Sequence, residues 1–375
     1  NITKSQGYAF IRKLEGTIQN LTISGNIIKS NTNINNITVA GLICEGTNSK
    51  IENCVNAVSM NLKGGDLLIG GIAGKVTNTE VYNCLNKGEI KYTSTGTVAG
   101  IAGTANNSKI LKCSNIGTIE VANKAGGIVG WNENYNEIRN CNNSALITGG
   151  EGVGGIAATE NSYSKIIACY NSGDISGTTK VGGICGYIWQ ENGQPEMLNS
   201  CYNTGKVIGT EIVGGIVGMA SDQQIRYCYN TGSISANKIV GGIVGQLVWG
   251  EQYFIVGLIE GCYNLGVVNA TSSTIKNLGI LGHLKNGTIK NCYYYQDGKV
   301  LGYTNYTHMD SDGTKEIETD YEKENSQQSD LYSEKFLQET LGFKKFISES
   351  DVEENYSNVW KFNNKDNPKL WWESK

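Results

Sequence analysis

Short stretches of alternating apolar and polar residues recur along this chain at a nearly constant interval, each bounded by Gly, Asn, Ser or Thr. The clearest stretch reads Gly-Gly-Ile-Val-Gly at 126–130, 214–218 and 241–245, with near copies at 70–74, 154–158 and 182–186 and looser copies at 40–43, 99–103 and 279–282. Successive copies are mostly 27 to 32 residues apart, and the last interval is 37 residues. A fixed period of this size predicts a repeat architecture, in which each unit buries its apolar face against its neighbours.

A second motif, Ile-x-x-Cys-x-Asn-x-Gly-x-Ile, lies between the glycine marks and keeps the same period. Its cysteines are Cys54, Cys84, Cys113, Cys141, Cys169, Cys201, Cys228, Cys262 and Cys292. Two places after the first eight come Asn56, Asn86, Asn115, Asn143, Asn171, Asn203, Asn230 and Asn264. The ninth copy has Tyr294 instead, and a degenerate earlier copy has Leu21 at the cysteine position. The chain therefore holds about ten units, counting the degenerate one.

Each unit contains three short alternating segments, centred on Gly-Ile-Val-Gly, on Ile-x-x-Cys and on the Gly-x-Ile or Gly-x-Val that follows the asparagine. Such runs predict β-strands, and no unit has a helical pattern of useful length. The only prolines are Pro195 and Pro368, and 49 of 375 residues are glycine, about twice the usual share of roughly 7%. We therefore expect an all-β fold, a parallel β-solenoid of about ten rungs on the order of 50 Å long.

The asparagines and cysteines should form two inward-facing columns along the stack. Each asparagine amide can donate to one neighbour and accept from the other, which satisfies buried polar groups at a turn. Cysteine is small and apolar enough for a core position. A disulfide needs Cβ atoms about 3.8 Å apart with converging side chains, and structural zinc usually takes Cys-x-x-Cys pairs, which the sequence lacks. We expect buried free thiols, no metal site and no cofactor.

The repeat ends near residue 300, which divides the chain into a solenoid of residues 1–300 and a C-terminal linker and capping segment of residues 301–375. Ser333 is suited to begin a short helix that ends at Gly342. The last rung of a solenoid needs cover, because it otherwise offers an open β edge. We expect a small α+β cap whose aromatic residues close the end of the rod or lie along it near the tyrosine rungs: Trp360, Trp371 and Trp372.

Composition narrows the classes of partner and location. The net charge is −4, so nucleic acid is a poor partner, and no apolar run approaches the ~20 residues of a membrane span. Abundant Asn, Ser, Thr, Tyr and Gly with few Arg is typical of a secreted rod on a bacterial cell surface. The chain starts at Asn1 without a Met or a signal segment, and we interpret it as a piece of a larger surface protein.

One candidate binding surface is a row of tyrosines that directly follow the cysteines and should point outward: Tyr170, Tyr202, Tyr229, Tyr263 and Tyr293. Aromatic rings supply contact area at low entropy cost, so an exposed row suits glycan or protein binding. The alternative is that stacked tyrosines stabilise neighbouring strands, or that the C-terminal tail lies over them.

The second candidate surface is the loop after the Gly-Ile-Val-Gly strand, where the insertions between rungs fall. Its aromatic residues include Trp131, Tyr163, Trp189, Trp249 and Tyr253. Insertions in a solenoid fall on one edge, which is often the binding edge, and Trp189 and Trp249 should lie two rungs apart, on the order of 10 Å. The alternative is that these aromatics fold back and fill gaps between long loops.

The Gly-Gly-Ile-Val-Gly mark followed by Cys-Tyr-Asn-x-Gly resembles the GLUG-motif repeats of bacterial cell-surface proteins, which also occur in adhesin-like proteins and bacterial IgA-specific metallopeptidases. The closing segment, a short helix followed by Trp360 and Asn367-Pro368-Lys369-Leu370-Trp371, resembles the end of such arrays. The peptidases carry a zinc-binding His-Glu-x-x-His, whereas this chain has only His283 and His308 in other contexts. The resemblance implies a repeat region that projects, spaces or binds, without the peptidase domain.

Catalysis has little support in the sequence. Parallel β-helices include polysaccharide lyases and hydrolases, but the acidic residues here are scattered, and no pair recurs on adjacent rungs at one face position. We therefore expect a non-catalytic, adhesin-like surface module that binds host glycan or protein. The alternative is a carbohydrate-active β-helix enzyme.

Overall fold

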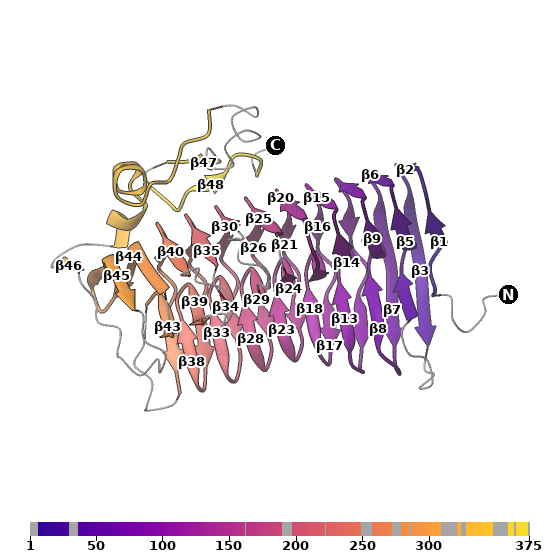
Figure 1. Ribbon diagram of the computed structural model, residues 1–375, viewed down its shortest axis with the longest axis horizontal. Coiled ribbons are helices and arrows are strands. Elements are labelled where there is room, and N and C mark those ends of the chain that lie inside the picture. Colours follow the sequence, from indigo (N-terminus) through magenta and orange to yellow (C-terminus); the bar gives the residue numbers. More distant parts are fainter. Residues whose placement is uncertain are drawn as a thin grey trace.

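The computed structural model describes residues 7–29, 37–161, 163–189, 197–221, 223–248, 257–271, 279–285, 287–308, 321–323, 328–347, 359–363 and 365–373. The fold is a parallel β-solenoid of about nine turns, with 58% of residues in strands and 4% in helices. The N-terminal rung lies at one end of the rod, and the C-terminal segment folds back along one side of the other end (Figure 1). The predicted fold class is confirmed.

One repeat shows how each rung is built. Its strands are β13 (Gly96–Ala99), β14 (Ala102–Asn106), β15 (Lys109–Leu111), β16 (Ser114–Asn115) and β17 (Ile119–Val121). Each of them pairs in parallel with its counterpart in the next rung, so three faces run along the rod. A rung therefore contains five strands rather than the three segments that the sequence pattern predicts.

The first two faces come from the two longer strands of each rung. The ten-stranded face contains β1 (Ile11–Leu14), β5 (Ile43–Thr47), β9 (Ala73–Thr77), β14, β19 (Val129–Asn132), β24 (Ala157–Asn161), β29 (Cys185–Trp189), β34 (Val217–Ser221), β39 (Val244–Val248) and β43 (Leu281–Leu284). The eight-stranded face contains β4 (Ile37–Ala40), β8 (Leu67–Gly70), β13, β18 (Lys124–Gly126), β23 (Glu151–Gly154), β28 (Thr179–Gly182), β33 (Ile212–Gly214) and β38 (Ile239–Gly241).

The third face consists of short strands on either side of the cysteine and asparagine columns. Before the cysteines lie β2 (Thr17–Gln19), β6 (Lys50–Glu52), β10 (Glu80–Tyr82), β15, β20 (Glu137–Arg139), β25 (Lys165–Ile167), β30 (Met197–Asn199), β35 (Gln224–Arg226) and β40 (Leu258–Glu260). At the asparagines lie β3 (Thr22–Lys29), β7 (Val55–Leu62), β11 (Leu85–Asn86), β16, β21 (Asn142–Asn143), β26 (Tyr170–Asn171), β31 (Tyr202–Asn203), β36 (Tyr229–Asn230) and β41 (Tyr263–Asn264). The rung is completed by β12 (Ile90–Tyr92), β17, β22 (Ile147–Thr148), β27 (Ile175–Ser176), β32 (Val207–Ile208), β37 (Ile234–Ala236) and β42 (Val268–Ala270).

The glycine mark is a corner between two faces, which corrects the expectation that it is the centre of a strand. Strand β18 (Lys124–Gly126) ends just before this corner, and β19 (Val129–Asn132) begins just after it. A Cβ atom at Gly127 would lie 2.1 Å from the carbonyl oxygen of Gly155 and 2.8 Å from the side chain of Asn143. The backbones approach too closely there for any side chain, which explains the glycine at this position.

The asparagine column is present as predicted and faces the glycine corner. From Asn56 to Asn230, each amide nitrogen donates to the Oδ1 of the asparagine in the next rung at 2.7–2.8 Å, and Asn264 accepts the last of these bonds. Each also donates to the backbone carbonyl two residues further on. The ladder ends where Ile23 lies opposite Asn56 and Tyr294 lies opposite Asn264. Two apolar clusters fill the rest of the rod's interior.

The cysteine column is also present, and the prediction of buried free thiols is confirmed. All eleven cysteines are buried and free. In the middle of the rod the backbone N–H of Cys113 donates to the Sγ of Cys141 at 3.4 Å, and the N–H of Cys141 donates to the Sγ of Cys169 at 3.4 Å. Burial raises the pKa of all three thiols well above the ordinary range, so they remain protonated.

The C-terminal end of the rod is closed by antiparallel strands. Strand β44 (Gly287–Gln296) forms a hairpin with β45 (Lys299–His308), and β45 pairs with β46 (Tyr321–Lys323). The predicted domain boundary at 300 therefore falls inside this hairpin, and the sheet continues past it. On this face the antiparallel strand β45 occupies the edge of β44, so a further parallel strand cannot pair with β44 there.

The capping segment is small and irregular, as predicted. It contains a 3-10 helix, η1 (Gln328–Tyr332), a short π-helix, η2 (Phe336–Thr340), and the paired strands β47 (Trp360–Lys361) and β48 (Lys369–Leu370). The hydroxyl of Ser333 accepts a hydrogen bond from a backbone N–H of η2 at 3.3 Å, and the φ angle of Gly342 is +77°. Both predicted limits of this helical segment are confirmed. No helix in the described part of the chain is long and apolar enough to cross a membrane.

Candidate ligand-binding site

The tyrosine row lies beneath the C-terminal segment, which corrects its prediction as an exposed binding surface. The rings of Tyr170, Tyr202, Tyr229 and Tyr263 are stacked at centroid distances of 5.1, 4.8 and 5.0 Å. Tyr202, Tyr229, Tyr263 and Tyr293 are buried, and only Tyr170 is partly exposed. The alternative interpretation, in which the tail lies over these rungs, describes the observed arrangement.

Specific hydrogen bonds hold the C-terminal segment on the tyrosine row. The hydroxyl of Tyr202 lies 2.7 Å from the carboxylate of Glu373. The hydroxyl of Tyr229 donates to the carbonyl oxygen of Pro368 at 2.8 Å, and the hydroxyl of Tyr263 donates to the side-chain oxygen of Asn367 at 2.9 Å. The row is therefore a docking platform for the chain's own C-terminal segment, seen above the solenoid in Figure 1.

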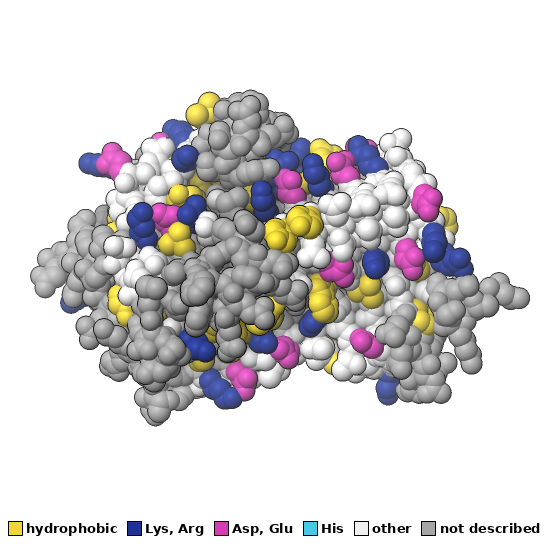
Figure 2. All heavy atoms as spheres, viewed as in Figure 1, with side chains coloured by type: hydrophobic (Ala, Val, Ile, Leu, Met, Phe, Trp, Pro, Cys, Tyr) yellow, Lys and Arg dark blue, Asp and Glu magenta, His cyan; other side chains and the backbone are white. Residues whose placement is uncertain are grey.

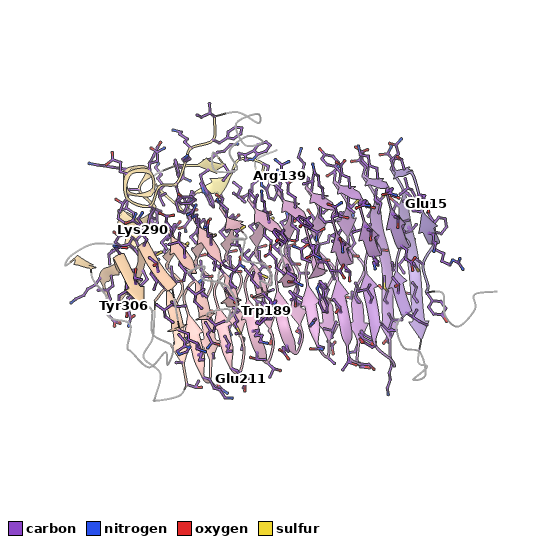
Figure 3. All side chains as sticks on the ribbon, in the orientation of Figure 1. Glu15, Arg139, Trp189, Glu211, Lys290 and Tyr306 are labelled. Carbon is purple, nitrogen blue, oxygen red and sulfur yellow. The ribbon has the colours of Figure 1, made fainter. Side chains whose placement is uncertain are left out.

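The predicted aromatic edge is present in part, and its residues come from strands as well as loops. Trp131 is a residue of β19 and Trp189 is the last residue of β29, so strand alternation, which places every second side chain outside, exposes both indoles. They are 37% and 40% exposed, and Figure 3 shows Trp189 on the solenoid near the middle of the rod. Trp249 and Tyr253 lie outside the described residues.

Tyr163 is placed at the next corner of the rod, away from the two indoles along the chain. Its ring stacks on that of Tyr135 at a centroid distance of 4.7 Å. Both tyrosines have a positive φ, +64° and +56°, as do the asparagines at the same turn of earlier rungs, for example Asn78. This pair is an exposed aromatic stack on a turn, and it lines no described hollow with Trp131 and Trp189.

Trp131 and Trp189 both line a hollow of about 200 Å³, which we call the aromatic slot. Its walls and floor come from three consecutive rungs of two neighbouring faces. The register places Trp131, Thr159 and Tyr187 in one outward column of the ten-stranded face. The slot is lined by Lys124, Trp131, Glu151, Gly152, Thr159, Asn161, Lys180, Tyr187 and Trp189.

A lysine from the eight-stranded face covers an aromatic ring on each side of the slot. The Nζ of Lys124 lies 4.1 Å from the ring centroid of Trp131, and the Nζ of Lys180 lies 4.5 Å from that of Tyr187. These distances are typical of cation–π contacts. The rung between them carries Gly152 at the equivalent lysine position, so no third lysine side chain lies between these two.

Gly152 keeps this gap open for a conformational reason. Its φ is +74°, a backbone conformation that favours glycine. A Cβ atom there would make only ordinary contacts, the nearest of them 3.5 Å from the Oγ1 of Thr159. Thr159 lines the slot, and its buried hydroxyl has no hydrogen-bond partner among the described residues. The hydrogen-bonding capacity of this hydroxyl is therefore unused within the described part of the chain.

The charges in the slot are unevenly paired. Lys180 donates to Glu151 Oε1 at 2.6 Å, whereas the Lys124 ammonium lies over the Trp131 ring. Burial lowers the pKa of Lys124, and the nearby Glu151 carboxylate partly opposes this. Burial raises the pKa of Tyr187 to about 12, so its hydroxyl stays neutral at physiological pH. Two lysines and one carboxylate line the slot, and the carboxylate of Asp66, outside the lining, also acts to raise the pKa of Lys124.

Other chemistry has less support in the described part of the chain. No group of three His, Cys, Asp or Glu side chains is arranged there to hold a metal ion. The ring of His283 makes a 2.9 Å hydrogen bond to the side chain of Gln246, so it is engaged away from the slot. Figure 2 shows hydrophobic side chains mixed with charged ones along the rod, rather than one large apolar patch.

The repeat pattern predicted the indoles of the slot but not its charged residues, Lys124, Glu151 and Lys180. They belong to the strand that precedes each glycine corner, and aligning the outward positions of that strand across rungs would have revealed them. Comparison with protein-family models finds no match to this chain, and a search of curated proteins also finds none. The proposed function therefore depends on the residues and geometry of the aromatic slot.

Proposed function

We propose that this chain is a non-catalytic recognition module that binds carbohydrate on a host surface through the aromatic slot. The observation that carries the proposal is the gap at Gly152 and Thr159, between two rungs whose aromatic rings are each covered by a lysine. The site is concave and rigid, because its residues stand on strands that pair on both sides.

A sugar ring suits this mixture of groups. Pyranoses have C–H faces that pack on aromatic rings and hydroxyls that need closely placed donors and acceptors. Trp131 and Trp189 supply exposed aromatic surface, while Glu151, Thr159 and Tyr187 supply an acceptor and two hydroxyls within the same hollow. A host protein is the other partner class for such a surface, and the experiment below separates the two.

Binding without cleavage is favoured over the alternative of a carbohydrate-active enzyme. Glycoside hydrolases use a pair of carboxyl groups on either side of the scissile bond. The slot lining contains one carboxylate, Glu151, and it is hydrogen-bonded to Lys180. The residues of the slot thus supply positioning groups but lack the second carboxyl group that hydrolysis needs.

The proposed setting is extracellular, as part of a larger protein on a bacterial cell surface. The polar composition, the resemblance to GLUG-motif repeats and the rod shape support this setting. A rod of about nine turns is on the order of 40 Å long. It would space its neighbouring segments and present the slot on its side.

The test is binding of the purified chain to a glycan array and to isolated host surface proteins. Trp131→Ala combined with Trp189→Ala should keep the fold and lose glycan binding. The matched control is Tyr135→Ala, which removes an exposed ring outside the slot. Loss of binding in the control alone, or binding only to protein, would overturn the proposal. Release of new reducing ends from a bound polysaccharide would instead support the enzyme.

A further inference from the structure

We infer that the aromatic slot is selective for acidic sugars, pyranoses that carry one negatively charged group such as a carboxylate or a sulfate. This inference rests on the proposed carbohydrate binding and specifies its ligand class. The slot joins aromatic surface to the ammonium group of Lys124, which makes no ion pair with a carboxylate in the described part of the chain.

The two lysines of the slot, Lys124 and Lys180, differ in their partners, and this difference favours an anionic ligand. Lys180 has a carboxylate partner, Glu151, so its charge is compensated within the slot. Lys124 contacts the face of Trp131, which attracts a cation through its quadrupole but accepts no strong hydrogen bond. An ammonium group has three donors, so Lys124 retains the capacity to bind an anionic oxygen.

The position of the Lys124 ammonium also favours an anionic ligand. Lys124 is partly buried, and its pKa is lowered because burial disfavours the charged form. An anion placed beside it restores a favourable environment for the charge, and water screens such a pair less than an exposed one. The ligand therefore gains more from a negative group here than at a lysine on the open surface of the rod.

The space between the walls formed by Trp131 and Tyr187 also suits a sugar ligand. Trp131 and Tyr187 are two rungs apart, roughly 10 Å. The intervening rung contributes Glu151, Gly152, Thr159 and Asn161 to the lining, and none of these is aromatic. We place one pyranose ring in this space, over the Thr159 side chain, whose buried hydroxyl has no hydrogen-bond partner among the described residues. The anionic group of the same ring then meets Lys124 at the wall.

The test measures binding of the full chain to matched pairs of sugars by calorimetry. The pairs are trigalacturonate with its methyl ester, sialyllactose with lactose, and sulfated lactose with lactose. Acidic members should bind roughly ten- to a hundredfold more tightly than their neutral partners. Their affinity should also fall as salt is raised, because part of it is electrostatic.

Two charge-matched variants separate the slot from the general charge of the rod. Lys124→Gln should reduce affinity for the acidic sugars to the level of the neutral ones. Lys75→Gln, which removes the same charge from an exposed position two rungs before Trp131 in the same column, should leave binding unchanged. Thermal unfolding of both variants checks that the fold is intact.

The outcomes distinguish this inference from the proposed function. Equal binding of acidic and neutral sugars that is lost in the Trp131→Ala, Trp189→Ala variant would overturn acidic selectivity and leave carbohydrate binding standing. Binding of no sugar at all would overturn both. Equal loss of affinity in the Lys124→Gln and Lys75→Gln variants would show attraction by overall charge, and would also overturn the selective site.

Discussion

Replacing Asn171 by alanine should destabilise the middle of the rod more than its size suggests. Its amide donates to Asn203 Oδ1 at 2.7 Å and to the carbonyl of Gly173 at 2.7 Å, and it accepts a hydrogen bond from Asn143 at 2.8 Å. The side chain is fully buried, so water cannot replace these partners. The substitution leaves a donor on Asn143 and an acceptor on Asn203 without partners.

The magnitude follows from the groups left unpaired. Each buried polar group without a partner costs about 1–3 kcal/mol, so two of them predict a loss of roughly 2–6 kcal/mol for Asn171→Ala. When Asn203→Ala is added, the Asn203 acceptor that Asn171→Ala leaves unpaired is no longer present. The Asn171 donor that Asn203→Ala alone would leave unpaired is absent as well. The double variant should therefore lose roughly 2–6 kcal/mol less than the sum of the two single variants.

Urea unfolding followed by circular dichroism measures the three variants against the parent chain. Native-state hydrogen exchange is the second assay, because repeat stability is a sum over neighbours and the loss should concentrate in adjacent rungs. Asn86→Ala combined with Asn171→Ala is the matched control, since these residues lie three rungs apart and share no hydrogen bond. Additive losses are expected there. Additive losses for the Asn171 and Asn203 pair would refute the ladder as an energetic unit.

Three further results are expected. Glu160 is fully buried and burial raises its pKa to about 8, so the unfolding free energy of the chain should fall as pH rises from about 4.5 to about 8. Glu160→Gln should remove this pH dependence and be more stable than the parent chain above pH 8 by roughly 3–5 kcal/mol. An unchanged pH dependence in this variant would contradict the burial of a titrating carboxyl group. The native chain should react with almost no thiol reagent, and all eleven cysteines should react in denaturant; rapid native reaction would show that the column opens. Removal of residues 328–375 should uncover the tyrosine row and cause self-association, whereas a truncated chain that stays monomeric would show that the C-terminal segment is dispensable.

The sequence was sufficient to predict the interior of the solenoid. A strand has a period of two residues, so one inward position in a repeat determines the rest, and the register carries it along the rod. This is why the asparagines and cysteines lie where the motif placed them, as in Asn171 and Cys169. The predicted capping helix beginning at Ser333 also holds, because its signals are local in the chain.

The surface was less predictable, because it depends on which parts of the chain meet. Alternation correctly places Tyr229 outside its strand, but only the folded C-terminal segment decides that it is buried against Pro368. The slot likewise joins Lys124 and Trp131 across a glycine corner. The sequence pattern did not predict this contact, because the corner was interpreted as the centre of a strand. Trp249 and Tyr253 lie outside the described residues, so their predicted role stays a prediction.

The slot occurs where one rung departs from the pattern of its neighbours. That rung carries Gly152 at a lysine position, Thr159 between two aromatic residues, and Glu160 at an inward position that is apolar in most other rungs. A buried carboxyl group and an unpartnered hydroxyl both cost stability. The rungs on either side can bear this cost, because they pair with it in register and continue the asparagine ladder through Asn171. In a rod built from near-identical units, a change confined to one rung is the simplest way to create one site without disturbing the stack. This is the physical reason for proposing a binding site at this rung.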